Sequence, residues 1–180
     1  MHATRQIFSR SLTVSAGVLF LVAALNAQSE KWKSFKYPAD GFRISFSSEP
    51  KLDQKKKEAK SGSILMNTYC SQIATVDLCV AVIDQGPEAT GLRTETLLGL
   101  VKLSVVAAPK TRRLNQQEID LDGHKGVEIE TENDTTHTVT RIYVVDRTLY
   151  QTMVTYPIGT KFADTNRFLN SFHLIPRARK

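Results

Sequence analysis

The most strongly patterned stretch of the chain is 137–156, which reads HTVTRIYVV, then Asp146-Arg147, then TLYQTMVTY. It is rich in Thr, Val, Ile and Tyr and has no Gly or Pro, a composition typical of two strands inside a sheet. We therefore predict a hairpin with Asp146-Arg147 as a two-residue turn. The pairs that would face each other are Tyr143 with Tyr150 and Val139 with Val154. Asp-Arg is not a favoured turn dipeptide, so a register shifted by one residue is the alternative.

Three further hairpins are predicted from alternation and turn residues. The first joins 32–37 to a strand in which Phe42, Ile44 and Phe46 recur at a spacing of two. The second joins 63–69 to 76–83. The third joins 112–120 to 125–131 through Asp122-Gly123, the strongest hairpin dipeptide of the chain.

Two segments have helical periodicity instead. From Thr94 to Pro109, seven apolar residues recur at spacings of three and four: Leu97, Leu98, Leu100, Val101, Leu103, Val105 and Val106. So broad an apolar face predicts a helix lying flat on a sheet, with Gly99 allowing close approach to a strand. A second helix is expected over 160–170, with Thr160 as its N-cap.

The remaining elements complete an α+β fold. Residues 51–62 are charged and lack apolar periodicity, which predicts a loop, and 172–175 predicts a short terminal strand. The short connections between strands favour antiparallel pairing. The prediction is an antiparallel sheet built of consecutive hairpins and covered by helices, because apolar helices must be buried against a sheet.

The N-terminal segment has the three parts of a signal peptide. Arg5 and Arg10 precede an apolar run of 14 residues from Leu12 to Leu25, and the small residue Ala27 follows. We predict cleavage near Ala27, giving a signal peptide at 1–27 and a single domain at 28–180. The alternative is that the segment stays as a membrane anchor.

The two cysteines both lie in the second hairpin. With a turn at Ala74-Thr75, Cys70 falls directly opposite Cys79 at a non-hydrogen-bonded position, where Cα atoms are close enough for a disulfide. In an exported protein we expect this pair to be bridged. The alternative is two buried thiols.

Sequence motifs for catalysis are absent, since no GxSxG, HExxH, P-loop or dinucleotide fingerprint occurs. His124, His137 and His173 would form a zinc site only if folding brought them together. Glu128, Glu130 and Glu132 share one strand face and could hold a cation or a basic partner, or simply face solvent. Asn133-Asp134-Thr135 matches a glycosylation sequon. We expect no cofactor.

Positive charge is locally concentrated within a net charge of +6. The segment 51–60 contains five lysines that form a candidate basic contact surface: Lys51, Lys55, Lys56, Lys57 and Lys60. The tail adds Arg177, Arg179 and Lys180. Such patches predict a weak attraction to anionic surfaces, or they are merely solvated. We expect no nucleic acid partner.

Several of these segments together resemble a known family. WKSFKYPADGFRISFSSEPK, the long second hairpin, the central helix, RIYVVDRTLYQTMV and RFLNSFHLI look like a family of exported bacterial domains. These domains are similar to the photosystem II extrinsic protein PsbP and to a eukaryotic Ran-binding import factor. The resemblance implies an α/β/α sandwich and an accessory or binding role. The chain departs from PsbP in its N-terminus and has no evident manganese or calcium pattern.

The expected function is therefore that of an exported, periplasmic or secreted domain without catalytic activity that binds another protein of the envelope. Two alternatives remain. One is an enzyme whose site is assembled from residues far apart in sequence. The other is a binder of anionic envelope lipid or polymer through the basic segment and tail.

Overall fold

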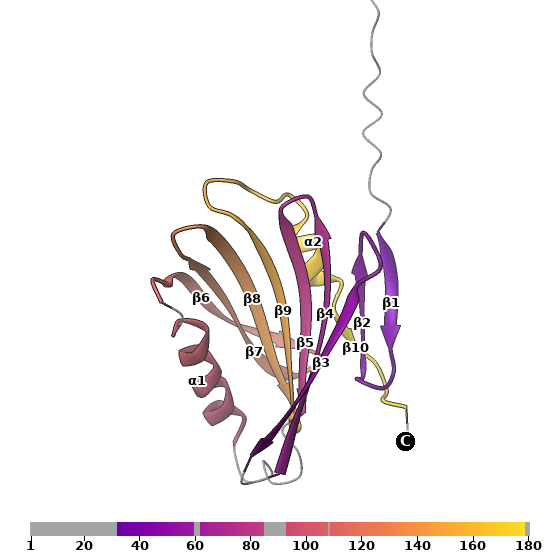
Figure 1. Ribbon diagram of the computed structural model, residues 1–180. Coiled ribbons are helices and arrows are strands. Elements are labelled where there is room, and N and C mark those ends of the chain that lie inside the picture. Colours follow the sequence, from indigo (N-terminus) through magenta and orange to yellow (C-terminus); the bar gives the residue numbers. More distant parts are fainter. Residues whose placement is uncertain (1–31, 60–61, 85–92, 108, 179–180) are drawn as a thin grey trace, which may run out of the picture.

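The computed structural model describes residues 32–59, 62–84, 93–107 and 109–178 (Figure 1). The predicted signal peptide, Lys60, Arg179 and Lys180 lie outside the described residues. Within the described part of the chain, no helix is both long and apolar enough to cross a membrane.

A seven-stranded antiparallel sheet forms the centre of the molecule. Neighbouring strands come from distant parts of the chain, because β5 pairs with β9. In spatial order the strands are β3 (Lys51–Ala59), β4 (Gly62–Ile73), β5 (Val76–Asp84), β9 (Thr148–Pro157), β8 (Thr136–Val145), β7 (His124–Glu132) and β6 (Arg112–Leu121).

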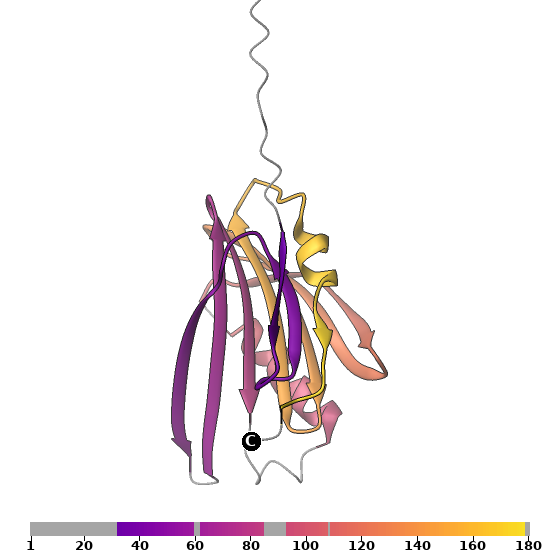
Figure 2. The same cartoon turned by 90° about the vertical axis from the view of Figure 1, so that its right-hand side faces the viewer.

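One face of this sheet, here called the inner face, is covered by a small sheet and a short helix. The small sheet has the order β1 (Lys33–Tyr37), β2 (Phe42–Phe46) and β10 (His173–Leu174), and the helix is α2 (Thr165–Asn170). Figure 2 shows β1 and β2 in front of the large sheet. Phe42, Ile44 and Phe46 of β2 are fully buried against it. Alternation in β2 therefore predicted its buried face correctly.

The opposite face, here called the outer face, carries α1 (Thr94–Val105), which packs on β7 and β8. Leu97 and Leu98 are buried there against Val127, Ile129 and Ile142. The layers are thus α1, the large sheet, and the small sheet with α2, which confirms the α+β sandwich. The inner layer contains strands as well as a helix.

The patterned hairpin has the unshifted register of the two that were considered. Tyr143 pairs with Tyr150 and Val139 with Val154 across β8 and β9. Asp146 has a φ of 53°, in the left-handed region that two-residue hairpin turns require. The third hairpin turns at Asp122-Gly123 as predicted, with φ values of 53° and 85°.

Three local predictions were wrong. Lys51–Ala59 is the edge strand β3 and not a loop, because its backbone pairs with β4 along its whole length. The C-terminal helix begins at Thr165, since Thr160 belongs to a turn in which its Oγ1 donates to the Pro157 carbonyl at 2.6 Å. Gly99 approaches no strand, because a Cβ there would meet nothing within 4 Å.

Candidate functional site

The outer face of the large sheet is only partly covered by α1. Directly paired residues of an antiparallel sheet share a face, so the register shows which side chains lie beside α1. One row runs Lys55, Met66, Ile83 and Leu149 across β3, β4, β5 and β9. The next row of the same face runs Asp53, Thr68, Ala81 and Gln151, and the row after it runs Lys51, Cys70, Cys79 and Met153. We call the half-buried part of these rows the open outer face, which is made of Met66, Thr68, Cys70, Cys79, Ile83, Gln151 and Met153.

The disulfide lies in the middle of this face. The sulfur atoms of Cys70 and Cys79 are 2.11 Å apart and their Cα atoms 4.2 Å apart. The pair is directly opposite in the β4–β5 register, as the predicted turn at Ala74-Thr75 requires. The bridge therefore ties together β4 and β5, two of the three strands that form the floor of the open outer face.

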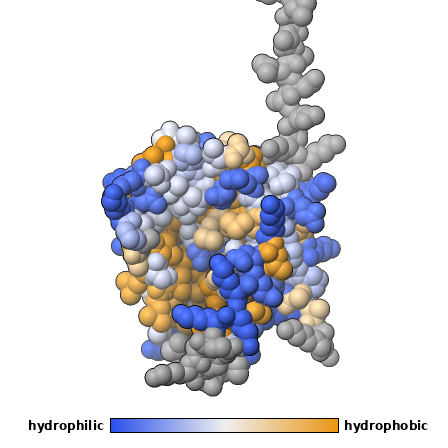
Figure 3. All heavy atoms as spheres, viewed as in Figure 1, coloured by the Kyte–Doolittle hydropathy of each residue, from blue (hydrophilic) through white to orange (hydrophobic). Residues whose placement is uncertain are grey.

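The flank of α1 that borders the open outer face is apolar and exposed. Glu95, Leu98 and Lys102 line a cleft of about 560 Å³ on the β6–β7 side of the helix. Leu100 lies two residues from both Leu98 and Lys102, which is roughly 200° around a helix, so it faces away from that cleft. Leu100 is 55% exposed on this flank, and Leu103 is 67% exposed on the adjoining side of the helix, opposite the sheet. Figure 3 shows the resulting hydrophobic area at the lower left, where α1 lies in Figure 1.

The opposite border is the lysine-rich edge strand β3. Lys51, Lys55 and Lys57 share the outer face with Met66, whereas Lys56 pairs with Leu65 on the inner face. Lys55 forms an exposed ion pair with Asp53 at 3.0 Å. The structure therefore divides the predicted basic surface between two faces. Three lysines line one border of the open outer face.

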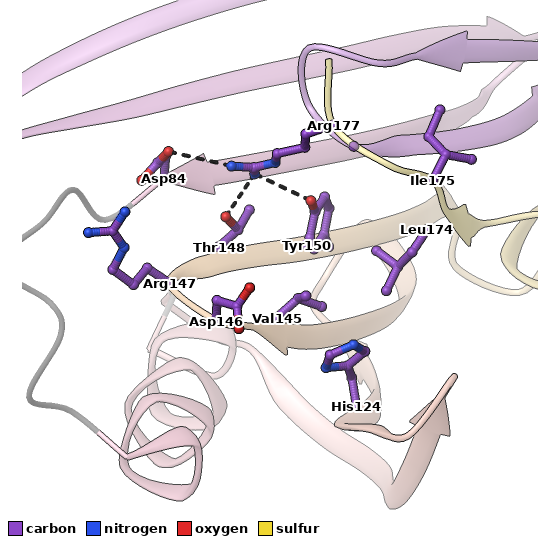
Figure 4. Close-up of a pocket in the computed structure, with 11 residues that line it drawn as sticks. Asp84, His124, Val145, Asp146, Arg147, Thr148, Tyr150, Leu174, Ile175 and Arg177 are labelled. Atoms are coloured by element: carbon purple, nitrogen blue, oxygen red, sulfur yellow. Dashed lines mark hydrogen bonds and ion pairs between the residues drawn. The ribbon is translucent and has the colours of Figure 1, made fainter. Parts of the chain in front are cut away.

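A pocket of about 340 Å³ at the end of the inner layer is lined by Arg177 of the C-terminal tail (Figure 4). The Arg177 guanidinium donates to Thr148 Oγ1 at 2.7 Å and to the Tyr150 hydroxyl at 3.3 Å. It also lies 3.8 Å from Asp84. Burial raises the pKa of Tyr150, while Arg177 opposes this shift. Arg177 thus binds the C-terminal segment to β9, although the sequence alone suggested that this residue belongs to a solvated tail.

A buried polar network joins the β1–β2 turn to β4. Asn67 donates to both carboxylate oxygens of Asp40 at 3.0 Å, and the Tyr69 hydroxyl donates to the same carboxylate. Burial, and next the hydrogen bond to Asp40, raise the pKa of Tyr69. Burial raises the pKa of Tyr37, whose ring contacts that of Tyr69, to about 12. These contacts fix the inner layer on the sheet.

The row of three glutamates meets basic partners within the same chain. Glu128 pairs with Arg141 at 2.6 Å and Glu132 with Arg112 at 2.9 Å. Glu130 lies 2.8 Å from His137 Nε2, although the atoms are not aligned for a hydrogen bond. The row is therefore neither fully solvated nor a cation site: within the described ranges no group of His, Cys, Asp or Glu side chains could hold a metal ion.

The three candidate histidines do not converge. His124 lines the Arg177 pocket, and His137 lines a different cleft of about 470 Å³ with Glu130 and Tyr156. His173 contacts the Ser171 carbonyl through Nδ1 at 2.8 Å.

Sequence reasoning missed the exposed flank of α1, because it assigned all seven apolar residues to one buried face. A signal was present in the helical wheel. Leu97, Leu98, Val101 and Val105 cluster within one third of the circumference, but Leu103 lies on the opposite side.

Comparison with known proteins identifies the fold. The chain matches no family model and no curated protein. It is similar to the solution structure of cyanobacterial PsbP (CyanoP) from Synechocystis sp. PCC 6803, with 12% identity and a TM-score of 0.55. The match covers 86% of this chain and 98% of that one. The chain therefore has a PsbP-like fold, as its sequence resemblance predicted.

Two other solved structures are more distant. One is a Pseudomonas aeruginosa protein of unknown function described as a putative regulator, with 7% identity, a TM-score of 0.33 and coverage of 69% of this chain and 82% of that one. The other is from Bacteroides thetaiotaomicron, with 9% identity, a TM-score of 0.37 and coverage of 82% and 48%.

Proposed function

We propose that this protein is an exported accessory domain without catalytic activity, which binds another protein of the cell envelope through its open outer face. The observation that carries the proposal is the exposure of Leu100 on α1 beside a half-buried sheet surface, with Leu103 exposed on the adjoining solvent side of the helix. Fully burying one such side chain contributes about 1.5–3 kcal/mol. Contiguous exposed apolar surface on a domain is typical of interaction sites.

The export part of the proposal rests on one feature of the sequence and one of the structure. The chain begins with a basic segment followed by a 14-residue apolar run and Ala27. Its two cysteines lie at disulfide distance, which suits an oxidising compartment. Intact-mass analysis of the protein recovered from the envelope tests this part. A mass that includes residues 1–27 would contradict cleavage and favour a membrane anchor.

Binding of an anionic lipid or polymer is the second candidate, because Lys51, Lys55 and Lys57 share one face of an edge strand. An edge strand also needs such lysines to prevent pairing with other chains. Contacts made by exposed charges weaken at high ionic strength, whereas apolar contacts do not. Salt dependence therefore separates this candidate from the protein-binding function.

The enzyme alternative would require reactive side chains that converge in a cleft. In the cleft that contains His137 and Glu130, these two groups already contact each other. In the Arg177 pocket, the guanidinium that lines the cavity is already hydrogen-bonded to Thr148 and Tyr150 of the same protein. Both observations favour structural roles for these clefts and support the binding function.

The deciding experiment is affinity purification of the tagged protein from its own envelope fraction in low and in high salt. A stoichiometric protein partner that survives high salt is the expected result. The double variant Leu100→Gln/Leu103→Gln should lose this partner, because Gln keeps the helix propensity but removes the apolar surface. Leu114→Gln, which changes a 39% exposed leucine on β6 at the other edge of the sheet, is the matched control.

Two outcomes would overturn the proposal. Recovery of lipid or polymer alone, lost in high salt, would identify a charged-surface binder. Recovery of a small metabolite would instead revive the enzyme hypothesis.

A further inference from the structure

We infer that the open outer face binds an acidic amphipathic helix of the partner, lying beside α1 with its carboxylates towards β3. This inference rests on the proposed function and specifies the partner's chemistry at the same face.

The space available fits one helix. α1 packs on β7 and β8, and packed helices lie about 8–10 Å apart. Because strands are about 4.8 Å apart, a second helix beside α1 would lie above β9 and β5. Those strands contribute Met153, Cys79 and Ile83 to the open outer face. On its other side, such a helix would be within side-chain reach of β3.

The floor of the open outer face is mainly apolar, with Thr68 and Gln151 as polar side chains between its two ends. Met66 and Met153 are the only methionines of the chain apart from Met1, and both lie on this face. Methionine side chains are flexible and polarizable, so they adapt to the apolar side chains of a partner. The half-buried disulfide between Cys70 and Cys79 holds β4 and β5 in register. An amphipathic helix would place its apolar stripe on this floor and against Leu100.

The positive charge of the lysines along β3 favours a partner with acidic side chains. Lys51, Lys55 and Lys57 face the open outer face, and Asp53 and Asp77 are the acidic residues that share it. Asp53 pairs with Lys55. From Lys51 to Lys57 a strand extends about 20 Å, which equals roughly 13 residues of helix. A matching helix would have three to four turns with carboxylates along one flank.

Two other occupants match the charge less well. A second copy of the protein could offer its own α1, but this helix has a single acidic residue, Glu95, which already pairs with Lys125 at 3.3 Å. The apolar run 12–25 of the same chain contains no acidic residue. Complementarity to the lysine border therefore favours a different, acidic partner.

The test uses the mature protein recovered from the envelope and two synthetic helical peptides of about four turns. Both peptides carry the same leucine stripe, but one has a glutamate flank and the other a lysine flank. Binding is measured by fluorescence anisotropy at low and moderate salt. We expect the protein to bind the glutamate peptide at least 10-fold more tightly than the lysine peptide.

Reversing the charge of the β3 lysines should make the protein prefer the lysine peptide to the glutamate peptide. Lys51→Glu/Lys57→Glu should weaken the glutamate peptide at least 10-fold and strengthen the lysine peptide. Lys33→Glu/Lys36→Glu, on the exposed edge strand β1 of the inner layer, is the matched control and should change neither affinity more than twofold. Leu100→Gln/Leu103→Gln should weaken both peptides. Unchanged thermal unfolding of each variant shows that it is folded.

Equal affinity for the two peptides, or no response to the Lys51→Glu/Lys57→Glu reversal, would overturn the inference. Self-association of the protein that Leu103→Gln abolishes would identify a second copy as the occupant and also overturn it. If the envelope partner still binds both Lys51→Glu/Lys57→Glu and Leu100→Gln/Leu103→Gln, the proposed binding function stands, but the open outer face is not its site. If the unmodified protein recovers no partner, the proposed function itself fails.

Discussion

The inner and outer faces of the large sheet differ in how completely they are covered. The inner face is covered by the small sheet β1-β2-β10 and by α2. Four phenylalanines are buried in this layer: Phe42, Phe46, Phe168 and Phe172. The outer face meets α1, which leaves Leu100 and Leu103 exposed. The same sheet thus has one face that is fully packed and stabilises the fold, and another face beside which apolar side chains remain exposed. Four predictions follow this difference, beginning with the largest effect.

Replacing an inner-face aromatic should destabilise the protein most. Phe42 is fully buried and stacks with Tyr37 and Phe172. Phe42→Ala should lower the free energy of unfolding by about 3–5 kcal/mol, because it leaves a cavity in a packed core. Urea denaturation followed by circular dichroism measures the loss. A change below about 1 kcal/mol would show that the small sheet is not firmly packed on the large one.

Removing the disulfide should have the next largest effect. Cys70→Ser/Cys79→Ser opens a loop with a sequence separation of 9, so the loss should be at or below the roughly 3 kcal/mol expected for a 15-residue loop. Urea denaturation of the oxidised protein and of the double variant gives the difference in their free energies of unfolding. Thiol titration of the unreduced, denatured protein should find no free thiol. Two thiols would contradict the bridge.

Alkaline pH should weaken the inner face selectively. Burial raises the pKa of Tyr37 from 10.0 to about 12, and Glu49 adds to the shift. The unfolded chain therefore loses this proton at lower pH than the folded protein does. The stability from the neutral phenol is full below about pH 10 and is lost as the pH rises from about 10 to 12.

The alkaline effect can be assigned by substitution. Tyr37→Phe should make the fall in unfolding free energy between pH 9 and 11 less steep, because Phe cannot ionise. Urea denaturation across this pH range measures the slope. An identical slope in the variant and the unmodified protein would show that Tyr37 ionises equally well in both states.

The smallest effect on stability is expected on the outer face. Leu103→Gln should change the free energy of unfolding by less than about 0.5 kcal/mol, since the side chain is 67% exposed and Gln is a comparable helix former. A loss above about 2 kcal/mol would mean that Leu103 is buried in the folded protein. In that case the contrast between the faces would not hold.

Local sequence patterns determined the elements that carry their own signals. Alternation in β2 and the turn at Asp122-Gly123 specify strands and a hairpin through side-chain period and backbone conformation. Counting from the turn at Ala74-Thr75 placed Cys70 opposite Cys79, because register follows once a two-residue turn is assigned. The PsbP-like fold was also visible in the order of these elements.

Only the tertiary structure decided features that depend on distant partners. Lys51–Ala59 contains a single large apolar residue, Leu52, and forms a strand because β4 supplies backbone hydrogen bonds that side-chain pattern does not encode. The pairing of β5 with β9 joins segments about seventy residues apart, and it sets the width of the sheet. That width exceeds what α1 covers. The exposure of Leu100 beside the uncovered strands is therefore a consequence of sheet size. Leu103 is exposed because it lies on the side of α1 opposite the buried face, which the helical wheel of the sequence already indicates.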